Sequence, residues 1–253
     1  MRSILGAVAR IARRPALLIG AVAAAVVVGA AVVGVVATGD DARPEPERRA
    51  VLAAPSPSAA STSVPPAPVP SAPAHDDVAP AAPTDFRIAG PEFDIQATVC
   101  GMPFVRPLDP PGDQYHTVCW VERDFGVAPG SASGGTTYIL GHSWAYAQLV
   151  LNQLSERATL EYPGAGPQYE GGIPIYPVTG LAGYRIWLTT PNGTLGYDVS
   201  RAYLVGKNDA GSVQSLMANS PDRVVIITCA VKEGRDLDYN VIVEAQISSS
   251  TKA

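Results

Sequence analysis

Residues 15–39 form a run of 25 positions without Asp, Glu, Lys or Arg. As one α-helix this run would extend roughly 37 Å, at about 1.5 Å per residue, which is enough to cross a hydrocarbon core of about 30 Å. Arginines precede the run and acidic residues follow it at once, an asymmetry that keeps the N-terminus in the cytoplasm. We therefore predict a cytoplasmic basic N-terminus at 1–14 and a single-pass transmembrane helix at 15–39 in the cell membrane.

Two other interpretations of this run stay open. A cleaved signal peptide would have the same orientation, although its apolar region is usually only about 7–15 residues long. A buried helix of a soluble domain is the second alternative. Membrane anchor and signal peptide agree that the rest of the chain lies outside the cytoplasm.

A segment rich in proline and alanine follows the charge-free run. Positions 41–85 contain 11 Pro, 12 Ala and 5 Ser, and no aromatic residue. Such a composition cannot bury enough apolar surface to offset the entropic cost of ordering the chain, and its prolines favour extended polyproline II. We predict a disordered extracytoplasmic linker at 40–85, in which His75 has no functional role.

From residue 86 onward, apolar stretches alternate with turn residues. The patterns predict five strands, in GTTYILGH, GYRIWLTT, LGYDVSRAYLV, RVVIITCAV and NVIVEAQI. Asn192 and Gly193 are the strongest hairpin signal, and helical spacing occurs only at 145–156. Many short strands with one or two short helices predict an all-β domain at 86–253, either a barrel or a sandwich.

Charge and motif content exclude several classes of function. The region 86–253 has 11 basic and 16 acidic residues, a balance that argues against nucleic acid as a partner. The three cysteines show no CxxC spacing, and no HExxH, Walker A or GxGxxG motif occurs. We therefore predict no metal site and no cofactor.

One cysteine and one histidine stand where chemistry is possible. Cys229 follows the apolar stretch RVVIIT and His142 follows TTYIL, so both side chains are expected at strand ends. A thiol next to an imidazole is a common activated nucleophile, and a nearby cation such as Arg235 or Lys232 would stabilise the oxyanion. The alternatives are a buried cysteine that acts as a small hydrophobe and a structural histidine.

The stretch ILGHS, a helix after it, then IITC and a final strand NVIVEA resemble the sortase family of membrane-anchored cysteine transpeptidases of Gram-positive bacteria. The order of histidine, cysteine and basic residue also matches. The stretch CWVERDFGVAPGSASGGTTYILGHS is similar to the segment that precedes the histidine in actinobacterial, class E/F-like sortases. The resemblance extends over about residues 98–247.

The resemblance implies a fold and a reaction. The fold is a closed eight-stranded β-barrel with one or two short helices. Cys229 would be the nucleophile that attacks an LPxTG-like sorting signal, and His142 the general acid/base. The resulting thioacyl-enzyme would pass to an amine of a cell-wall precursor or another acceptor. A papain-like peptidase is disfavoured because those enzymes place the cysteine before the histidine.

The cation departs from the family pattern. Sortases carry an arginine at the start of the last strand, where this chain has Asp238 or Asn240. Arg235 lies a few residues earlier and is our candidate for stabilising the substrate and the oxyanion. If it does not reach the site, the alternative is a weak or inactive sortase-fold module that binds peptides at the cell surface.

Cys100 and Cys119 are 19 residues apart and form a disulfide candidate, since an extracytoplasmic location permits oxidation. Pairing them would leave Cys229 as the odd free thiol. Two free, buried thiols are the alternative. His116 is a weaker candidate than His142 because no strand is predicted to end beside it.

Overall fold

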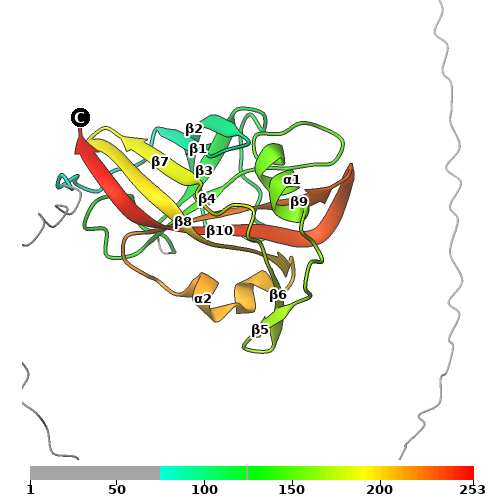
Figure 1. Ribbon diagram of the computed structural model, residues 1–253. Coiled ribbons are helices and arrows are strands. Elements are labelled where there is room, and N and C mark those ends of the chain that lie inside the picture. Colours follow the sequence, from blue (N-terminus) through cyan, green and yellow to red (C-terminus); the bar gives the residue numbers. More distant parts are fainter. Residues whose placement is uncertain (1–74, 124) are drawn as a thin grey trace, which may run out of the picture. The chain divides into compact units, whose positions relative to one another are not determined.

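The computed structural model describes residues 75–253 with the exception of residue 124 (Figure 1). The predicted membrane helix at 15–39, the predicted basic N-terminus and nearly all of the predicted linker lie outside the described residues. Within the described part of the chain, no helix is both long enough and apolar enough to cross a membrane.

Strands dominate the described chain. They are β1 (Asp85–Ala89), β2 (Asp94–Pro103), β3 (Thr117–Glu122), β4 (Thr136–Leu140), β5 (Gln168–Glu170), β6 (Ile173–Pro177), β7 (Arg185–Thr190), β8 (Gly193–Gly206), β9 (Arg223–Lys232) and β10 (Arg235–Lys252). The helices are α1 (Asn152–Thr159), the single 3-10 turn η1 (Ala210–Ser212) and α2 (Gln214–Met217).

Eight of the strands close into a barrel (Figure 1). Their order is β10-β9-β4-β3-β2-β1-β7-β8, and β8 pairs in turn with β10, so no free edge is left in the ring. The short β5–β6 hairpin extends from one part of β8. The closed, mainly-β eight-stranded barrel with few helices that we expected is thereby confirmed.

The curved sheet packs an apolar cluster on each of its two faces. Inward residues of all eight ring strands form the barrel core, as Phe86 of β1 and Ile186 of β7 illustrate. A second cluster lies on the outer face and includes Val225 of β9, Ile242 of β10 and Leu216 of α2. Strand β4 is buried at every position, because both of its faces are covered. This outer cluster is the floor on which the candidate site is built.

The predicted hairpin is present between β7 and β8, with its turn one residue earlier than expected. Thr190 pairs with Gly193, so Pro191 and Asn192 occupy the turn. Gly193 has a φ of +148°, and a Cβ there would collide with the carbonyl oxygen of Thr251 on β10. Glycine is required at this position because strand β10 approaches the backbone so closely.

The predicted helix at 145–156 is displaced toward the C-terminus, since α1 begins at Asn152. The side chain of Asn152 accepts hydrogen bonds from the backbone N–H groups of Trp144 and Leu149 and donates one to the Trp144 carbonyl. These local bonds hold the preceding residues in turns rather than in a helix. Helix α1 packs against strand β9, as the ribbon shows (Figure 1).

The packed chain begins upstream of Phe86. The backbone N–H of Asp76 bonds to the carbonyl of Ser250 on β10 at 3.2 Å, and Val78 is buried in the barrel core. The last residues of the segment that we predicted as linker therefore lie against the barrel and pair with its final strand.

Candidate active site

A cavity of about 490 Å³ lies against the outer face of β4, β9 and β10. Both predicted catalytic side chains, His142 and Cys229, line it. Its walls are largely apolar and include Phe104, Phe125 and Leu216. An apolar cleft with a few converging polar groups is the usual form of a site for a small ligand or peptide segment.

Sheet register explains why His142 and Cys229 meet. Strands β4 and β9 are parallel neighbours, and Leu140 at the end of β4 pairs with Ile227. The backbone N–H of Gly141 donates to the carbonyl of Ile227 at 3.3 Å, so the chain still follows β9 one residue before His142. The hydroxyl of Ser143 also bonds to Thr228 at 2.9 Å and donates to the carbonyl of Cys229. The two segments are thus tied together next to the cavity.

Helix α1 fixes the backbone around the cysteine. The hydroxyl of Ser155 donates to the carbonyl of Cys229 at 2.8 Å and accepts from the N–H of Val231 at 2.7 Å. One turn further, the hydroxyl of Thr159 donates to the carbonyl of Val231 at 2.6 Å. These side chains satisfy backbone groups on the β4 side of β9, where no strand pairs with β9 beyond Ile227 because β4 ends at Leu140.

Cys229 is a free, half-buried thiol. It lies within β9 rather than at its end, at the last position before the irregular pairing with β10. Burial raises the pKa of this thiol above its usual range; the charge of Lys207 lowers the pKa by a smaller amount, and that of Asp236 raises it. At neutral pH the resting form is therefore the thiol, and nucleophilic attack requires that its proton be removed.

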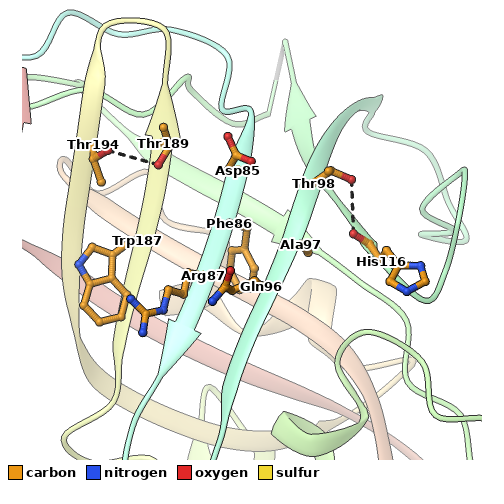
Figure 2. A pocket seen from close by; sticks show the side chains of 10 residues that line it. All are labelled: Asp85, Phe86, Arg87, Gln96, Ala97, Thr98, His116, Trp187, Thr189 and Thr194. Carbon is orange, nitrogen blue, oxygen red and sulfur yellow. Dashed lines mark hydrogen bonds between the residues drawn. The ribbon is translucent and has the colours of Figure 1, made fainter. Parts of the chain in front are cut away.

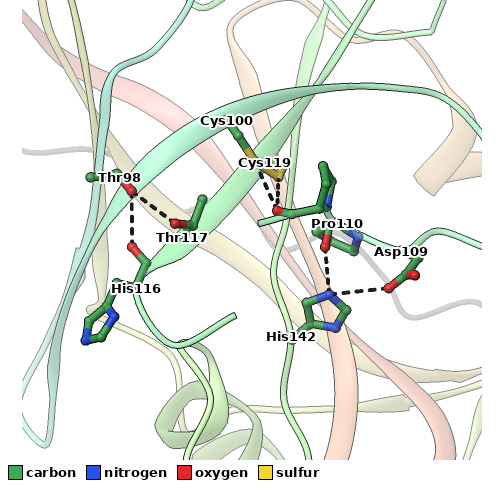
Figure 3. Close-up of a disulfide and its surroundings, with 9 residues drawn as sticks. Thr98, Cys100, Asp109, Pro110, His116, Thr117, Cys119 and His142 are labelled. Atoms are coloured by element: carbon green, nitrogen blue, oxygen red, sulfur yellow. Dashed lines mark hydrogen bonds and ion pairs between the residues drawn. A yellow bond between two sulfur atoms is a disulfide. The ribbon is translucent and has the colours of Figure 1, made fainter. Parts of the chain in front are cut away.

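His142 is engaged by the connection between β2 and β3. Its Nε2 atom lies 2.9 Å from the carbonyl oxygen of Pro110 and 3.5 Å from the Asp109 carboxylate (Figure 3). Because a carbonyl can only accept, Nε2 carries a proton in this arrangement. We call this connection, residues 104–116, the strap; it forms one wall of the cavity.

A disulfide joins the two strands that flank the strap. Cys100 of β2 and Cys119 of β3 are direct partners in the parallel register, with Cα atoms 4.4 Å apart. Their sulfur atoms lie 3.6 and 3.5 Å from the carbonyl oxygen of Pro111, which follows Pro110, the residue whose carbonyl contacts His142. The structure therefore joins the two cysteines that we singled out and leaves Cys229 free.

Arg235 is not among the residues that line the cavity. It pairs with Lys232, and directly opposed residues of two strands share a face. Lys232 is an odd number of positions from Cys229, so it projects to the other face of β9, where its ammonium donates to the carbonyl of Tyr162. The structure brings His142 and Cys229 together but leaves Arg235 on the opposite side of the sheet.

Two other polar residues line the cavity in which a cation was expected. Asn240, one of the two residues that the sortase resemblance places near the arginine position, is the direct partner of Cys229 and lines the cavity. Lys207 follows β8 and also lines it. We missed Lys207 because only cations close to Cys229 in sequence were considered. Its position after the apolar stretch LGYDVSRAYLV is the same strand-end signal that pointed to His142.

A second hollow, of about 540 Å³, lies over the outer faces of β1, β2, β7 and β8 (Figure 2). It contains none of the predicted catalytic residues. His116 lines its edge, and its ring bonds to the Asp113 carboxylate at 2.7 Å and lowers the pKa of that carboxyl. Among residues 75–253, leaving out position 124, no cluster of His, Cys, Asp and Glu could hold a metal ion.

Comparison with known proteins finds sequence similarity to none and partial structural similarity to sortases. No family model and no curated protein matches the chain. Sortase A from Listeria monocytogenes is 14% identical, with a TM-score of 0.40 over 68% of this chain and 92% of the other. Sortase A from Corynebacterium diphtheriae is 19% identical, with a TM-score of 0.38 over 66% and 61%. Streptococcus agalactiae sortase C1 is 10% identical, with a TM-score of 0.42 over 66% of this chain and 69% of the other. Overlap at this level does not identify the chemistry of the cavity.

Proposed function

We propose that the chain is a sortase-type cysteine transpeptidase that cleaves an LPxTG-like sorting signal and transfers the acyl part to an amine of the cell wall. The observation that supports the proposal is that His142 and Cys229 line the same, largely apolar cavity. The parallel pairing of β4 with β9 brings the segments that carry these two residues to the same cavity. The apolar walls suit a peptide with hydrophobic residues ahead of the scissile bond.

The reaction begins when Cys229 transfers its proton to His142 and the thiolate attacks the threonine carbonyl carbon of the Thr-Gly bond. A carbon–sulfur bond forms, and the carbonyl oxygen takes up the negative charge. As the oxyanion collapses, the carbon–nitrogen bond breaks and the imidazolium protonates the leaving glycine amine. The products of this half are a thioester on Cys229 and the released C-terminal fragment.

An amine acceptor completes the transfer. The neutral imidazole of His142 removes a proton from the acceptor as its nitrogen attacks the thioester carbon. The carbon–sulfur bond then breaks, an amide forms and Cys229 is regenerated. In the structure the Nε2 atom of His142 donates to the carbonyl of Pro110, so Nδ1 is the ring atom that can accept a proton in this arrangement.

The cellular setting is part of the proposal. We place a cytoplasmic N-terminus at 1–14, a membrane helix at 15–39 and a linker ahead of the barrel, in an actinobacterial, class E/F-like enzyme. A barrel attached to the membrane in this way would encounter secreted proteins and cell-wall precursors at the extracytoplasmic surface of the cell membrane. Support for this setting comes from the sequence.

The test is mass spectrometry of the full-length protein after incubation with an LPxTG-like peptide in the absence of an amine acceptor. We expect a thioester adduct on Cys229 with the mass of the peptide through its threonine. Cys229→Ala should abolish the adduct, and His142→Ala should slow its formation by roughly 10²–10⁴-fold. An adduct of the same mass on the Cys229→Ala variant would overturn the proposed nucleophile.

A second candidate is a peptide-binding module without catalysis. It is favoured by the neutral Asn240 opposite Cys229 and by the burial that raises the pKa of the thiol. Under this alternative the full-length protein binds the peptide but forms no adduct with any amine acceptor. Its Cys229 then also resists alkylation by iodoacetamide at neutral pH.

A further inference from the structure

The charge that develops in the cavity needs a positive partner. Thiolate attack on an amide places negative charge first on sulfur and then on the carbonyl oxygen, and a site of low polarity stabilises it only with fixed donors or cations. The described residues that line the cavity include Lys207 and Arg106 as cations and no Asp or Glu. The cavity is thus positive although the region 86–253 is acidic.

We propose that Lys207 is the cation that stabilises the thiolate of Cys229 and the substrate oxyanion. This inference rests on the proposed function and names the residue that takes the role we had predicted for Arg235. The positive charge would come from the residue after β8, which lies near Cys229 because β8 pairs with β10 and closes the barrel. It would not come from the β9–β10 hairpin.

The strand register places Lys207 on the same side of the sheet as the thiol. Cys229 of β9 pairs with Asn240 of β10, and Asn240 pairs on its other side with Val205 of β8. Directly opposed residues share a face, so these three side chains form one row. Lys207 comes directly after the end of β8, two positions beyond Val205, and lines the same cavity as Cys229 and Asn240. Its backbone N–H bonds to the carbonyl of Asp238 at 3.3 Å, which anchors it beside β10.

The charges around Cys229 agree with this placement. Lys207 after β8 and Asp236 on β10 act on the pKa of the thiol, while His142 after β4 and Arg106 on the strap line the same cavity. Lys207 is the cation whose field favours the thiolate, and Asp236 opposes it. Among the described residues, no carboxylate lies within ion-pair distance of the Lys207 ammonium, so its charge is available to an anion in the cavity.

Arg106 is less suited to this role. Its guanidinium lies over the ring of Phe104 at 5.6 Å from the centroid and against Gly211. The charges that act on the pKa of Cys229 are those of Lys207 and Asp236, and Arg106 is not among them. Lys207, by contrast, directly follows β8, which is a strand of the barrel ring.

The experiment compares Lys207→Met and Lys207→Arg with Lys252→Met in the full-length protein. Lys252 is an exposed lysine at the end of β10, paired with the first residue of β8. Two readouts are taken: the pH midpoint of Cys229 alkylation by iodoacetamide without substrate, and the rate of adduct formation with the LPxTG-like peptide. The thermal midpoint of each variant reports whether it folds.

We expect Lys207→Met to move the alkylation midpoint to higher pH and to slow adduct formation by roughly 10²–10³-fold. Lys207→Arg should recover most of the rate, and Lys252→Met should match the unmodified protein in both readouts. A Lys207→Met variant with an unchanged midpoint and an adduct rate within threefold of the unmodified protein would overturn the inference. If the unmodified protein forms no adduct, the proposed function fails, while the alkylation midpoint still decides whether Lys207 acts on Cys229.

Discussion

At the scale of single residues, the reactivity of Cys229 depends on a carboxylate as well as on a cation. Asp236 raises the pKa of the thiol, and its Oδ1 atom accepts a hydrogen bond from the N–H of Ala145 at 2.9 Å. Asp236→Asn removes the charge and keeps an acceptor oxygen. We therefore expect the pH midpoint of Cys229 alkylation to fall, with the rate measured by iodoacetamide labelling across neutral and alkaline pH.

The control for this prediction is Glu233→Gln, which removes a negative charge from the same hairpin at an exposed position. An equal shift in both variants would mean that general surface charge, and not Asp236, sets the midpoint. The sign also applies to stability. A thiol pKa raised by folding contributes stability that is fully present below the unfolded pKa of about 8.5 and lost as pH rises through the folded pKa. Asp236→Asn should reduce this alkaline loss.

Asn240 offers a second residue-scale prediction, because it is the direct partner of Cys229 and lines a cavity with room for a larger side chain. Asn240→Arg would place a guanidinium beside the sulfur and favour the thiolate. We expect a lower alkylation midpoint and faster adduct formation, by about tenfold per unit of pKa shift. Asn240→Met controls for size, and an Arg variant that behaves like the Met variant would contradict the prediction.

At the scale of elements, a buried arginine holds α2 against the barrel. Arg223 of β9 pairs with Glu244 of β10 at 3.3 Å, with side chains only 5% and 9% exposed. The same guanidinium donates to the carbonyls of Ser215 and Leu216, and Leu216 lines the cavity. Arg223→Met would leave a buried carboxylate without its main partner. We expect a loss of about 3 kcal/mol in the free energy of unfolding, measured by chemical denaturation.

The double variant Arg223→Met/Glu244→Met separates the two contributions to that loss. Removing both charges avoids the cost of an unpaired buried carboxylate, so the double variant should be more stable than Arg223→Met alone. If the two variants are equally unstable, the carbonyl contacts to α2 carry the effect and the ion pair does not.

Sequence patterns predicted the elements whose burial is regular. Strands β7 to β10 and β4 were found because their apolar residues recur with strand spacing, and His142 and Cys229 followed from their positions after two of these stretches. Strand β2 was missed: its sequence DIQATVCGMP has small and polar residues on an exposed face and gives a weak signal. The start of α1 was wrong because Asn152 forms side-chain bonds to the preceding turn, which periodicity does not register.

The rest of the site depends on contacts between segments far apart in the chain. Lys207 lines the same cavity as Cys229 only because β8 pairs with β10 and closes the barrel. The carbonyl of Pro110 meets His142 only because β2 and β3 run in parallel and the strap must cross the outer face to connect them. Neither relationship is local, so the pattern of residues around Cys229 could not indicate it.

At the scale of the whole molecule, the barrel is a closed ring of hydrogen-bonded strands. The disulfide between Cys100 and Cys119 adds a covalent link, which closes a loop that contains the strap. Cross-linking residues 19 apart restricts the unfolded chain and is worth about 3 kcal/mol. We expect Cys100→Ala/Cys119→Ala to lose about that amount in the free energy of unfolding, measured by denaturation of the full-length protein. Replacing both cysteines leaves no new free thiol beside Cys229. If the double variant loses less than about 1 kcal/mol, the hydrogen bonds and packing of the parallel β2–β3 pair already restrain the strap. A loss near 3 kcal/mol would show that the barrel depends on this disulfide for stability. The disulfide joins β2 and β3 at the place where the strap leaves the sheet and contacts His142.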